Sequence, residues 1–238
     1  MKFQVGVDNN NEGRSIAWAL EHPGCFAYGI NAEGAVLNLE GALMKYAGWI
    51  LRHDTRSWLS FAEDEIELVV NGTWDVYYIN DEFDKISETD GYAVDSFFPF
   101  EWKPLTTDEI KHALDMLVWS RDDLLKTVKG LSTTQLDATY PGERWSINGI
   151  LGHVGGAEWW YLDRLGLAFP REEVPKDPME RLGKVRKHFA TALFGLDGVK
   201  KVVGVDGEFW SPRKMLRRTL WHEKDHTEHI HKLATGTN

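Results

Sequence analysis

The chain contains 238 residues, of which 42% are hydrophobic and 27% are charged, a composition typical of a globular protein with a sizeable core. A membrane-spanning segment is excluded because no apolar run approaches the roughly 18–20 residues that a bilayer requires, and no signal-peptide pattern opens the chain. The net charge is -10, and residues 1–100 carry 17 acidic against 6 basic side chains. Such an acidic half repels a phosphate backbone, so no nucleic-acid ligand is expected.

Short β-type runs dominate the first half of the chain. Three strands are predicted, separated by the turn sequences NNNEG and HPG. A helix follows, because Ala35, Leu39 and Leu43 begin an apolar stripe at four-residue spacing. A hairpin is then predicted around Asn71-Gly72, a dipeptide that favours tight turns. In chain order we expect strands at 2–7, 15–21 and 25–30, a helix at 32–51, and hairpin strands at 65–72 and 74–80.

The segment HPGCFAYGINAEGAVLNLEGALMKY, residues 22–46, resembles the HicB-like antitoxin domain. Members of that family share a P-G-C sequence, an alternating strand, and a helix that opens with glutamate and alanine. The resemblance covers roughly residues 1–70 and implies a small α+β fold in the order β-β-β-α-β. In HicB antitoxins this fold binds a partner toxin, so the resemblance implies a protein partner for the first domain. The basic DNA-binding tail of some antitoxins is missing from this sequence.

A domain boundary is predicted at SFFPFEWKPL, residues 96–105, where prolines and aromatic residues gather. The pattern changes there to long helical stretches, which gives domains at 1–100 and 101–238. The sequences TTDE, SING, DPME and SPRK place a capping residue or a proline at the start of each helix. Four amphipathic helices of this length predict an all-α four-helix bundle. They are expected at about 106–129, 146–165, 177–195 and 211–235.

Four histidines occur within LWHEKDHTEHIHKL, residues 220–233. At 100° per residue, His226 lies near 40° from His222 and shares its apolar face, whereas the neighbouring charged residues occupy the other faces. Two imidazoles one helical turn apart can reach the same cation, which would also offset the cost of burying them. A third ligand must come from another helix, and His153 in WSINGILGHVGG is the best candidate. The glycines around His153 indicate close helix approach or open space beside it.

Other interpretations of these residues stay open. His222 and His226 form the H-E-x-x-H pattern of zinc proteases, although Lys224 and Asp225 occupy positions that such proteases usually leave uncharged. The histidines could also be hydrogen-bonded core residues that bind no metal. His229 lies one turn further along the same face, which favours helix-end packing or a substrate contact. A last group of residues is predicted to form a solvated basic face at the start of the same helix: Arg213, Lys214, Arg217 and Arg218.

The sequences ERWSINGILGHVGGAEWWYLDRL and FWSPRKMLRRTLWHEKDHTEHIHKL together resemble the DinB/YfiT-like family of metal-binding bundles. The resemblance covers about residues 104–235 and implies an up-down-down-up four-helix bundle. By position in the motifs, it implies that His153, His222 and His226 bind a divalent metal. Zinc is the expected metal and nickel the alternative. Some relatives use a low-molecular-weight thiol such as bacillithiol, mycothiol or glutathione, and family members are often dimers, so a homodimer is expected.

These observations predict a metal-dependent enzyme that acts on a small molecule, with thiol S-transfer or a hydrolase-like reaction as the chemistry. We expect Glu223 to be catalytic through a ligand histidine or water, and Trp160, Arg164 and Trp221 to bind substrate. The alternative is a non-enzymatic, metal-stabilised module whose first domain binds a protein. Cys25 is the single cysteine and permits no internal disulfide, which predicts a cytoplasmic protein.

Overall fold

The computed structural model describes residues 1–87 and 90–236, which form two compact units. Among these residues the first unit comprises 1–87, 90–103 and 200–217, and the second comprises 104–199 and 218–236. In the first unit the elements are β1 (Lys2–Asn11), β2 (Arg14–Ala19), β3 (Phe26–Gly29), α1 (Ala32–His53), η1 (Glu63–Glu65), β4 (Glu67–Asp75), β5 (Tyr77–Ile79), β6 (Lys85–Ile86), β7 (Tyr92–Val94), η2 (Pro99–Trp102), β8 (Val203–Val205) and β9 (Glu208–Trp210). In the second unit they are α2 (Thr107–Val128), α3 (Thr133–Leu136), α4 (Ile147–Arg164), η3 (Arg171–Glu173) and α5 (Pro178–Phe194). Helix α6 (Pro212–Thr235) begins in the first unit and continues in the second.

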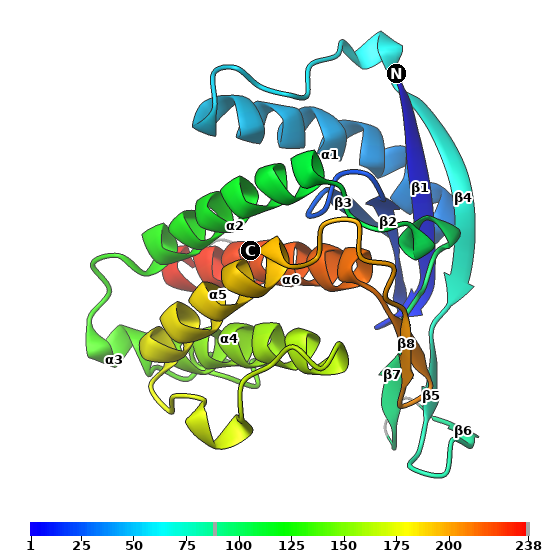
Figure 1. Cartoon of the computed structure of the whole chain (residues 1–238). Coiled ribbons are helices and arrows are strands. Elements are labelled where there is room, and N and C mark those ends of the chain that lie inside the picture. The colour runs from blue at the N-terminus through cyan, green and yellow to red at the C-terminus, as the bar shows by residue number, and fades with distance from the viewer. Residues whose placement is uncertain (88–89, 237–238) are drawn as a thin grey trace. The chain divides into compact units, whose positions relative to one another are not determined.

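The first unit is built on a four-stranded sheet in the order β3-β2-β1-β4. Strands β1, β2 and β3 pair antiparallel, whereas β4 pairs parallel with β1 after the chain has passed through α1. Helix α1 packs against this sheet through the predicted apolar stripe, and the Asn31 side chain caps its first turn (Figure 1). The predicted order β-β-β-α-β is therefore present in residues 2–75.

The hairpin predicted around Asn71-Gly72 is wrong. Strand β4 runs straight through both residues, and a β-bulge at Asn71 shifts its register against β1. The glycines serve the packing of the sheet instead, because a Cβ atom on Gly6 would lie 2.6 Å from the Phe98 ring and one on Gly72 would lie 3.4 Å from it. Long-range pairing with β1 thus overrides a local turn signal.

Residues 200–217 return the chain to the first unit, although the sequence placed them in the second domain. Strands β8 and β9 form a hairpin whose turn residues, Asp206 and Gly207, both have positive φ angles (49° and 78°). The hairpin is held to the rest of the unit by the Tyr92 hydroxyl, which donates to the Asp206 carbonyl over 2.9 Å. The Asp-Gly dipeptide is the local sequence signal for such a turn.

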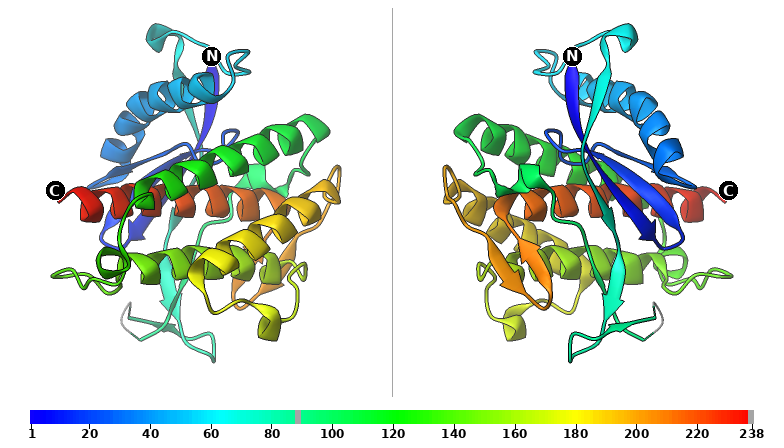
Figure 2. Two further views of the ribbon diagram at one scale, coloured as in Figure 1. Left: turned by 90° about the vertical axis from the view of Figure 1, so that its left-hand side faces the viewer. Right: turned by 90° about the vertical axis from the view of Figure 1, so that its right-hand side faces the viewer.

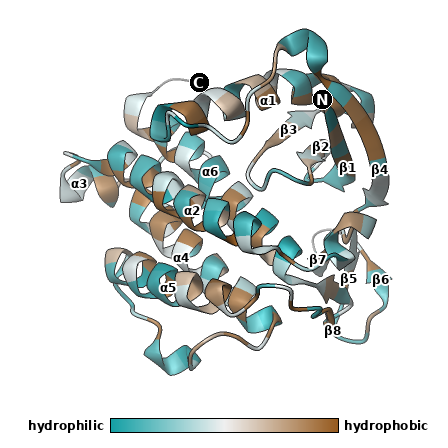
Figure 3. Ribbon diagram, turned by 45° about the horizontal axis from the view of Figure 1, so that its top comes forward, coloured by the Kyte–Doolittle hydropathy of each residue, from teal (hydrophilic) through white to brown (hydrophobic). Residues whose placement is uncertain are grey.

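Four long helices contribute to the second unit, and their predicted positions are confirmed to within two residues at each end. The side chains of Thr106, Ser146 and Asp177 accept hydrogen bonds from the first turns of α2, α4 and α5, as the capping sequences predict. The helices lie beside one another in both views of Figure 2, and hydrophilic and hydrophobic residues alternate around α2 and α5 in Figure 3. All four contribute to one buried core: Leu124, Ile147, Ile150, Leu151, Val154, Leu182 and Ile230. Within residues 1–87 and 90–236, no helix combines the length and the apolarity needed to cross a bilayer.

The basic face predicted at the start of α6 is buried rather than solvated. Arg217 donates from Nε to Glu101 over 2.7 Å, and the Lys214 ammonium group lies 3.4 Å from the Glu208 carboxylate. Both carboxylates belong to segments of the first unit, and Lys214 has no exposed surface. Buried cations require such partners, and a helical wheel drawn from α6 alone contains no information about them.

The core of the first unit also buries Asp8 on β1, whose carboxylate accepts a hydrogen bond from the Trp18 indole over 2.9 Å. Burial raises the pKa of Asp8 to about 6 although Arg217 acts in the opposite direction. The folded state therefore binds this proton more tightly than the unfolded state, whose Asp titrates near 3.8. Its contribution to stability is present at low pH and is lost as the pH rises from about 4 to about 6.

The substitution Asp8→Asn removes this buried charge and retains an acceptor for Trp18. At pH 8 the variant is expected to be about 3 kcal/mol more stable than the wild type, which is the free-energy equivalent of raising the Asp8 pKa from 3.8 to about 6. Near pH 4 the two proteins should be about equally stable. Urea unfolding at pH 4, 6 and 8 measures the difference, with Asp75→Asn on the exposed part of β4 as the control. A stability difference that does not change with pH would contradict the assignment.

Candidate metal centre

Three histidines from two helices of the bundle converge on one point. His153 lies on α4, and His222 and His226 lie one turn apart on α6. The Nε2 atom of His222 is 3.0 Å from that of His153 and 3.2 Å from that of His226. Three imidazole nitrogens bound to one tetrahedral metal at 2.0–2.1 Å would be separated by about 3.4 Å, so the observed spacing is close to that of a metal site.

The electrostatics of the triad keep its imidazoles neutral. Burial, followed by the neighbouring His153, lowers the pKa of His226 to about 4, although Asp225 acts in the opposite direction. Burial and the two neighbouring histidines lower the pKa of His222 well below its ordinary value. Burial, followed by Arg144, also lowers the pKa of His153. Neutral imidazoles are the form that donates a lone pair to a metal.

This donor set fits a divalent cation. In a neutral imidazole each ring nitrogen carries either a proton or a lone pair, so three Nε2 atoms that face one another cannot all form good hydrogen bonds with each other. One cation can accept a lone pair from all three. The triad is the group of three or more His, Cys, Asp or Glu side chains with metal-site spacing that is found among the described residues. Three nitrogen ligands favour zinc or nickel over magnesium or calcium, which prefer oxygen.

Aromatic rings surround the triad and fix the imidazoles. Trp145 stacks on His153 with ring centroids 4.6 Å apart, and the rings of Tyr161 and Trp221 lie 6.1 and 5.8 Å from that of His222. Trp145 precedes the first residue of α4, so helical spacing from His153 did not predict this contact.

Two glycines of α4 have the packing role that their helix-propensity cost indicated. A Cβ atom on Gly149 would lie 2.8 Å from the Cβ of Trp145, so glycine lets that indole fold back over the start of the helix. A Cβ atom on Gly155 would lie 3.0 Å from the Arg181 side chain on α5. Close approach of another helix, which was one of two expected explanations, therefore accounts for Gly155, whereas Gly149 makes room for Trp145 of the segment before its own helix.

Glu223, which the sequence predicts to be catalytic, lies in a buried network of ion pairs. Its Oε2 atom accepts from Arg121 over 2.7 Å and from Arg186 over 2.9 Å, and the same two arginines bind Glu158. Burial alone would raise the pKa of Glu223, but Arg186 and Arg121 outweigh it and lower the pKa. A carboxylate that is buried, ionised and held by two guanidinium groups is poorly suited to exchange protons with substrate. Through these ion pairs Glu223 joins α6 to α2 and α5, and its catalytic role stays a prediction.

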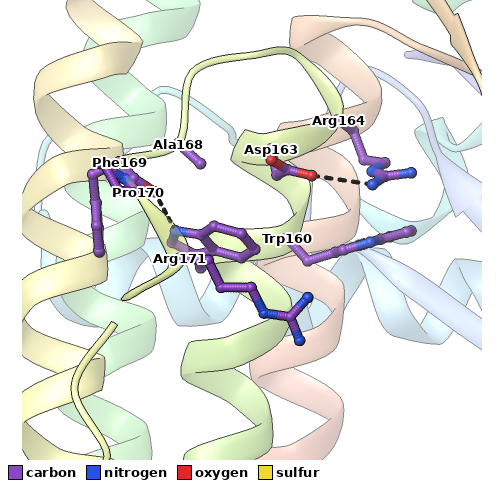
Figure 4. Close-up of a pocket in the computed structure, with 8 residues that line it drawn as sticks. Trp160, Asp163, Arg164, Ala168, Phe169, Pro170 and Arg171 are labelled. Atoms are coloured by element: carbon purple, nitrogen blue, oxygen red, sulfur yellow. Dashed lines mark hydrogen bonds and ion pairs between the residues drawn. The ribbon is translucent and has the colours of Figure 1, made fainter. Parts of the chain in front are cut away.

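The three predicted substrate-binding residues are only partly brought together. Trp160 and Arg164 line one cavity of about 510 Å³ at the end of α4, with the Arg164 guanidinium 4.7 Å from the Trp160 ring centre (Figure 4). Trp221 does not line that cavity; it packs against His222 and under the Arg218 guanidinium.

His229 was predicted to pack at the helix end or to contact a substrate. The structure places its Nε2 atom 2.9 Å from a Glu143 carboxylate oxygen.

The bundle and its triad define a candidate metal-binding helical-bundle protein. Residues 116–230, which include all three histidines, match the family model described as the DinB superfamily. A solved structure of YfiT from Bacillus subtilis, described as a probable metal-dependent hydrolase with an unusual four-helix bundle topology, is similar at 18% identity and a TM-score of 0.45. That alignment covers 57% of this chain and 93% of YfiT. No curated protein matches the chain significantly.

Proposed function

We propose that the helical unit is a metal-dependent enzyme that acts on a small molecule, with the metal held by His153, His222 and His226. The observation that carries the proposal is the convergence of three neutral Nε2 atoms from α4 and α6. The match of residues 116–230 to the DinB superfamily supports it. Zinc is the first candidate and nickel the second.

A divalent cation held by three neutral imidazoles supplies Lewis acidity that favours the deprotonated form of a water or thiol ligand. The protein's own residues contribute orientation and shielding. Trp145 and Tyr161 hold the imidazole planes of His153 and His222, and Glu223 stays ionised in its ion pairs. Cys25 is buried in the first unit, so a thiol nucleophile must arrive as a separate molecule. Transfer from a low-molecular-weight thiol and hydrolysis are the two reactions that this arrangement suits.

The proposal is tested with untagged protein stripped by a chelator and reloaded with zinc or nickel. Bacillithiol, mycothiol and glutathione are each offered with an electrophilic aryl halide, and simple esters and amides are offered without thiol. We expect turnover in the loaded protein. The activity of His153→Ala should fall by more than the roughly 10–100-fold that follows when a residue supporting a metal ligand is changed. His231→Ala, an exposed position on the same helix, is the control. Metal-loaded protein that turns over none of these substrates would favour the alternative below.

The alternative is a metal-stabilised interaction module, and an exposed aromatic cluster in the first unit favours it. Trp102 and Phe209 are 56% and 51% exposed, and both pack against Phe97. Large exposed aromatic residues are enriched at protein interfaces. Under this alternative the first unit is a HicB-like domain that binds a protein, and a homodimer is a further proposal. Light scattering separates monomer from dimer, and Trp102→Ser/Phe209→Ser should weaken any self-association that uses the cluster.

A further inference from the structure

The end of helix α4 and the segment that follows it enclose a cavity of about 510 Å³. Its lining is polar and aromatic at once: Trp159, Trp160, Asp163, Arg164, Ala168, Phe169, Pro170 and Arg171. The Trp159 indole donates to the Phe169 carbonyl over 2.9 Å, which fixes the loop to the helix. The walls of the cavity are therefore held in place by the chain's own contacts.

Two guanidinium groups give this cavity its charge. Arg164 donates to Asp163 over 3.1 Å and lies over Trp160, and Arg171 extends from the loop toward the helix (Figure 4). With Asp163 counted, the lining carries one net positive charge in a protein whose net charge is -10. A guanidinium binds a carboxylate through two parallel hydrogen bonds, and the half-exposed Trp160 ring offers an apolar face beside it. A doubly charged phosphate monoester would be repelled more strongly by Asp163.

The cavity lies on the same helix as one ligand of the metal centre. Trp160 follows His153 by seven residues, which is two turns or about 10 Å along the helix and nearly the same face. A continuous series of rings joins the two places, because Tyr161 lies 6.1 Å from His222 and 5.6 Å from Trp160. The span between the two places, about 10 Å along α4, is one that a single small molecule can cover.

We propose that Arg164, Arg171 and Trp160 form a binding site for the carboxylate end of a small molecule with a flat apolar part. This inference rests on the proposed function, because the bound molecule is taken to be the substrate of the metal centre. The guanidinium groups bind the carboxylate, Trp160 contacts the apolar part, and the opposite end of the molecule is directed toward the triad.

The test uses the full chain and three probes: 4-phenylbutanoate, its amide, and a phenylalkyl phosphate of matched length. Calorimetry or ligand-observed NMR measures binding to the wild type, Arg164→Gln and Arg171→Gln. The control is Arg52→Gln, which removes the same charge at an exposed position of α1. We expect the carboxylate to bind the wild type and the control alike, and about tenfold or more weakly in either cavity variant. Arg171 is exposed, so its variant stays informative if Arg164→Gln fails to fold.

Binding to His222→Ala/His226→Ala separates this inference from the proposed function. Carboxylate binding that persists there and is lost in the arginine variants supports the cavity, even if no metal or turnover is found. Binding that is lost in the histidine variant and unchanged in both arginine variants overturns the cavity and assigns the carboxylate to the metal. Equal binding of the amide, tighter binding of the phosphate, or no binding of the carboxylate also overturns the proposal.

Discussion

Untagged protein saturated with zinc and desalted is expected to retain about one zinc ion per chain, and the variant His222→Ala/His226→Ala is expected to retain none. The reason is the donor set, since removing two of three imidazoles leaves His153 alone and a single neutral ligand does not hold zinc. Elemental analysis of the desalted proteins measures the ratio. His231→Ala changes a histidine on the exposed side of the same helix and should leave the ratio unchanged.

Zinc binding should also stabilise the folded bundle. A ligand that binds only the native state at 1,000 times its dissociation constant adds about 4 kcal/mol to the free energy of unfolding. Urea unfolding with and without zinc should show this gain in the wild type and in His231→Ala, and not in the double variant. A wild type that retains no zinc and gains no stability would identify the triad as packing histidines. Zinc that persists in the double variant would place the metal elsewhere.

The sequence predicted well what local chemistry determines. Thr106, Ser146 and Asp177 mark helix starts because a cap is satisfied within its own turn, and the structure confirms all three. The pairing of His222 with His226 follows from helical spacing in the same way. His153 was the best candidate for the third ligand by its place on another helix, and the family resemblance pointed to the same residue; the structure places its Nε2 beside that of His222.

The features that the sequence did not predict depend on partners far along the chain. Asn71 and Gly72 carry a turn signature, yet β4 continues through them because β1 pairs with it over more than 60 residues of separation. Arg217 looked solvated because its partner Glu101 lies on a different segment, 116 residues away. The ion-pair partners of Glu223 come from α2 and α5, and its spacing along α6 gave no sign of them. Periodicity within one helix cannot report any of these contacts.

The buried ion-pair network is expected to have the largest effect on stability. The substitution Glu223→Gln leaves Arg121 and Arg186 with Glu158 as their one remaining carboxylate in the network. Breaking a buried pair by removing one partner costs about 3–5 kcal/mol, because the remaining charge is left uncompensated. Urea unfolding should show a loss of this size, whereas Glu228→Gln on the exposed side of α6 should change stability by less than about 0.5 kcal/mol.

A double-mutant cycle distinguishes the ion pair from a catalytic carboxylate. Arg121→Met and Glu223→Met each leave the network with an unbalanced charge, whereas the double variant leaves one arginine, Arg186, with one carboxylate, Glu158. The double variant is therefore expected to be more stable than the sum of the single losses predicts, by at least about 1 kcal/mol. It should also retain zinc, since all three histidines remain. Additive losses would show that Arg121 and Glu223 do not act as a pair. If Glu223→Gln abolished turnover with stability and zinc content unchanged, the carboxylate would have to act in the reaction itself, because its ion pairs would then contribute nothing to holding the helices together.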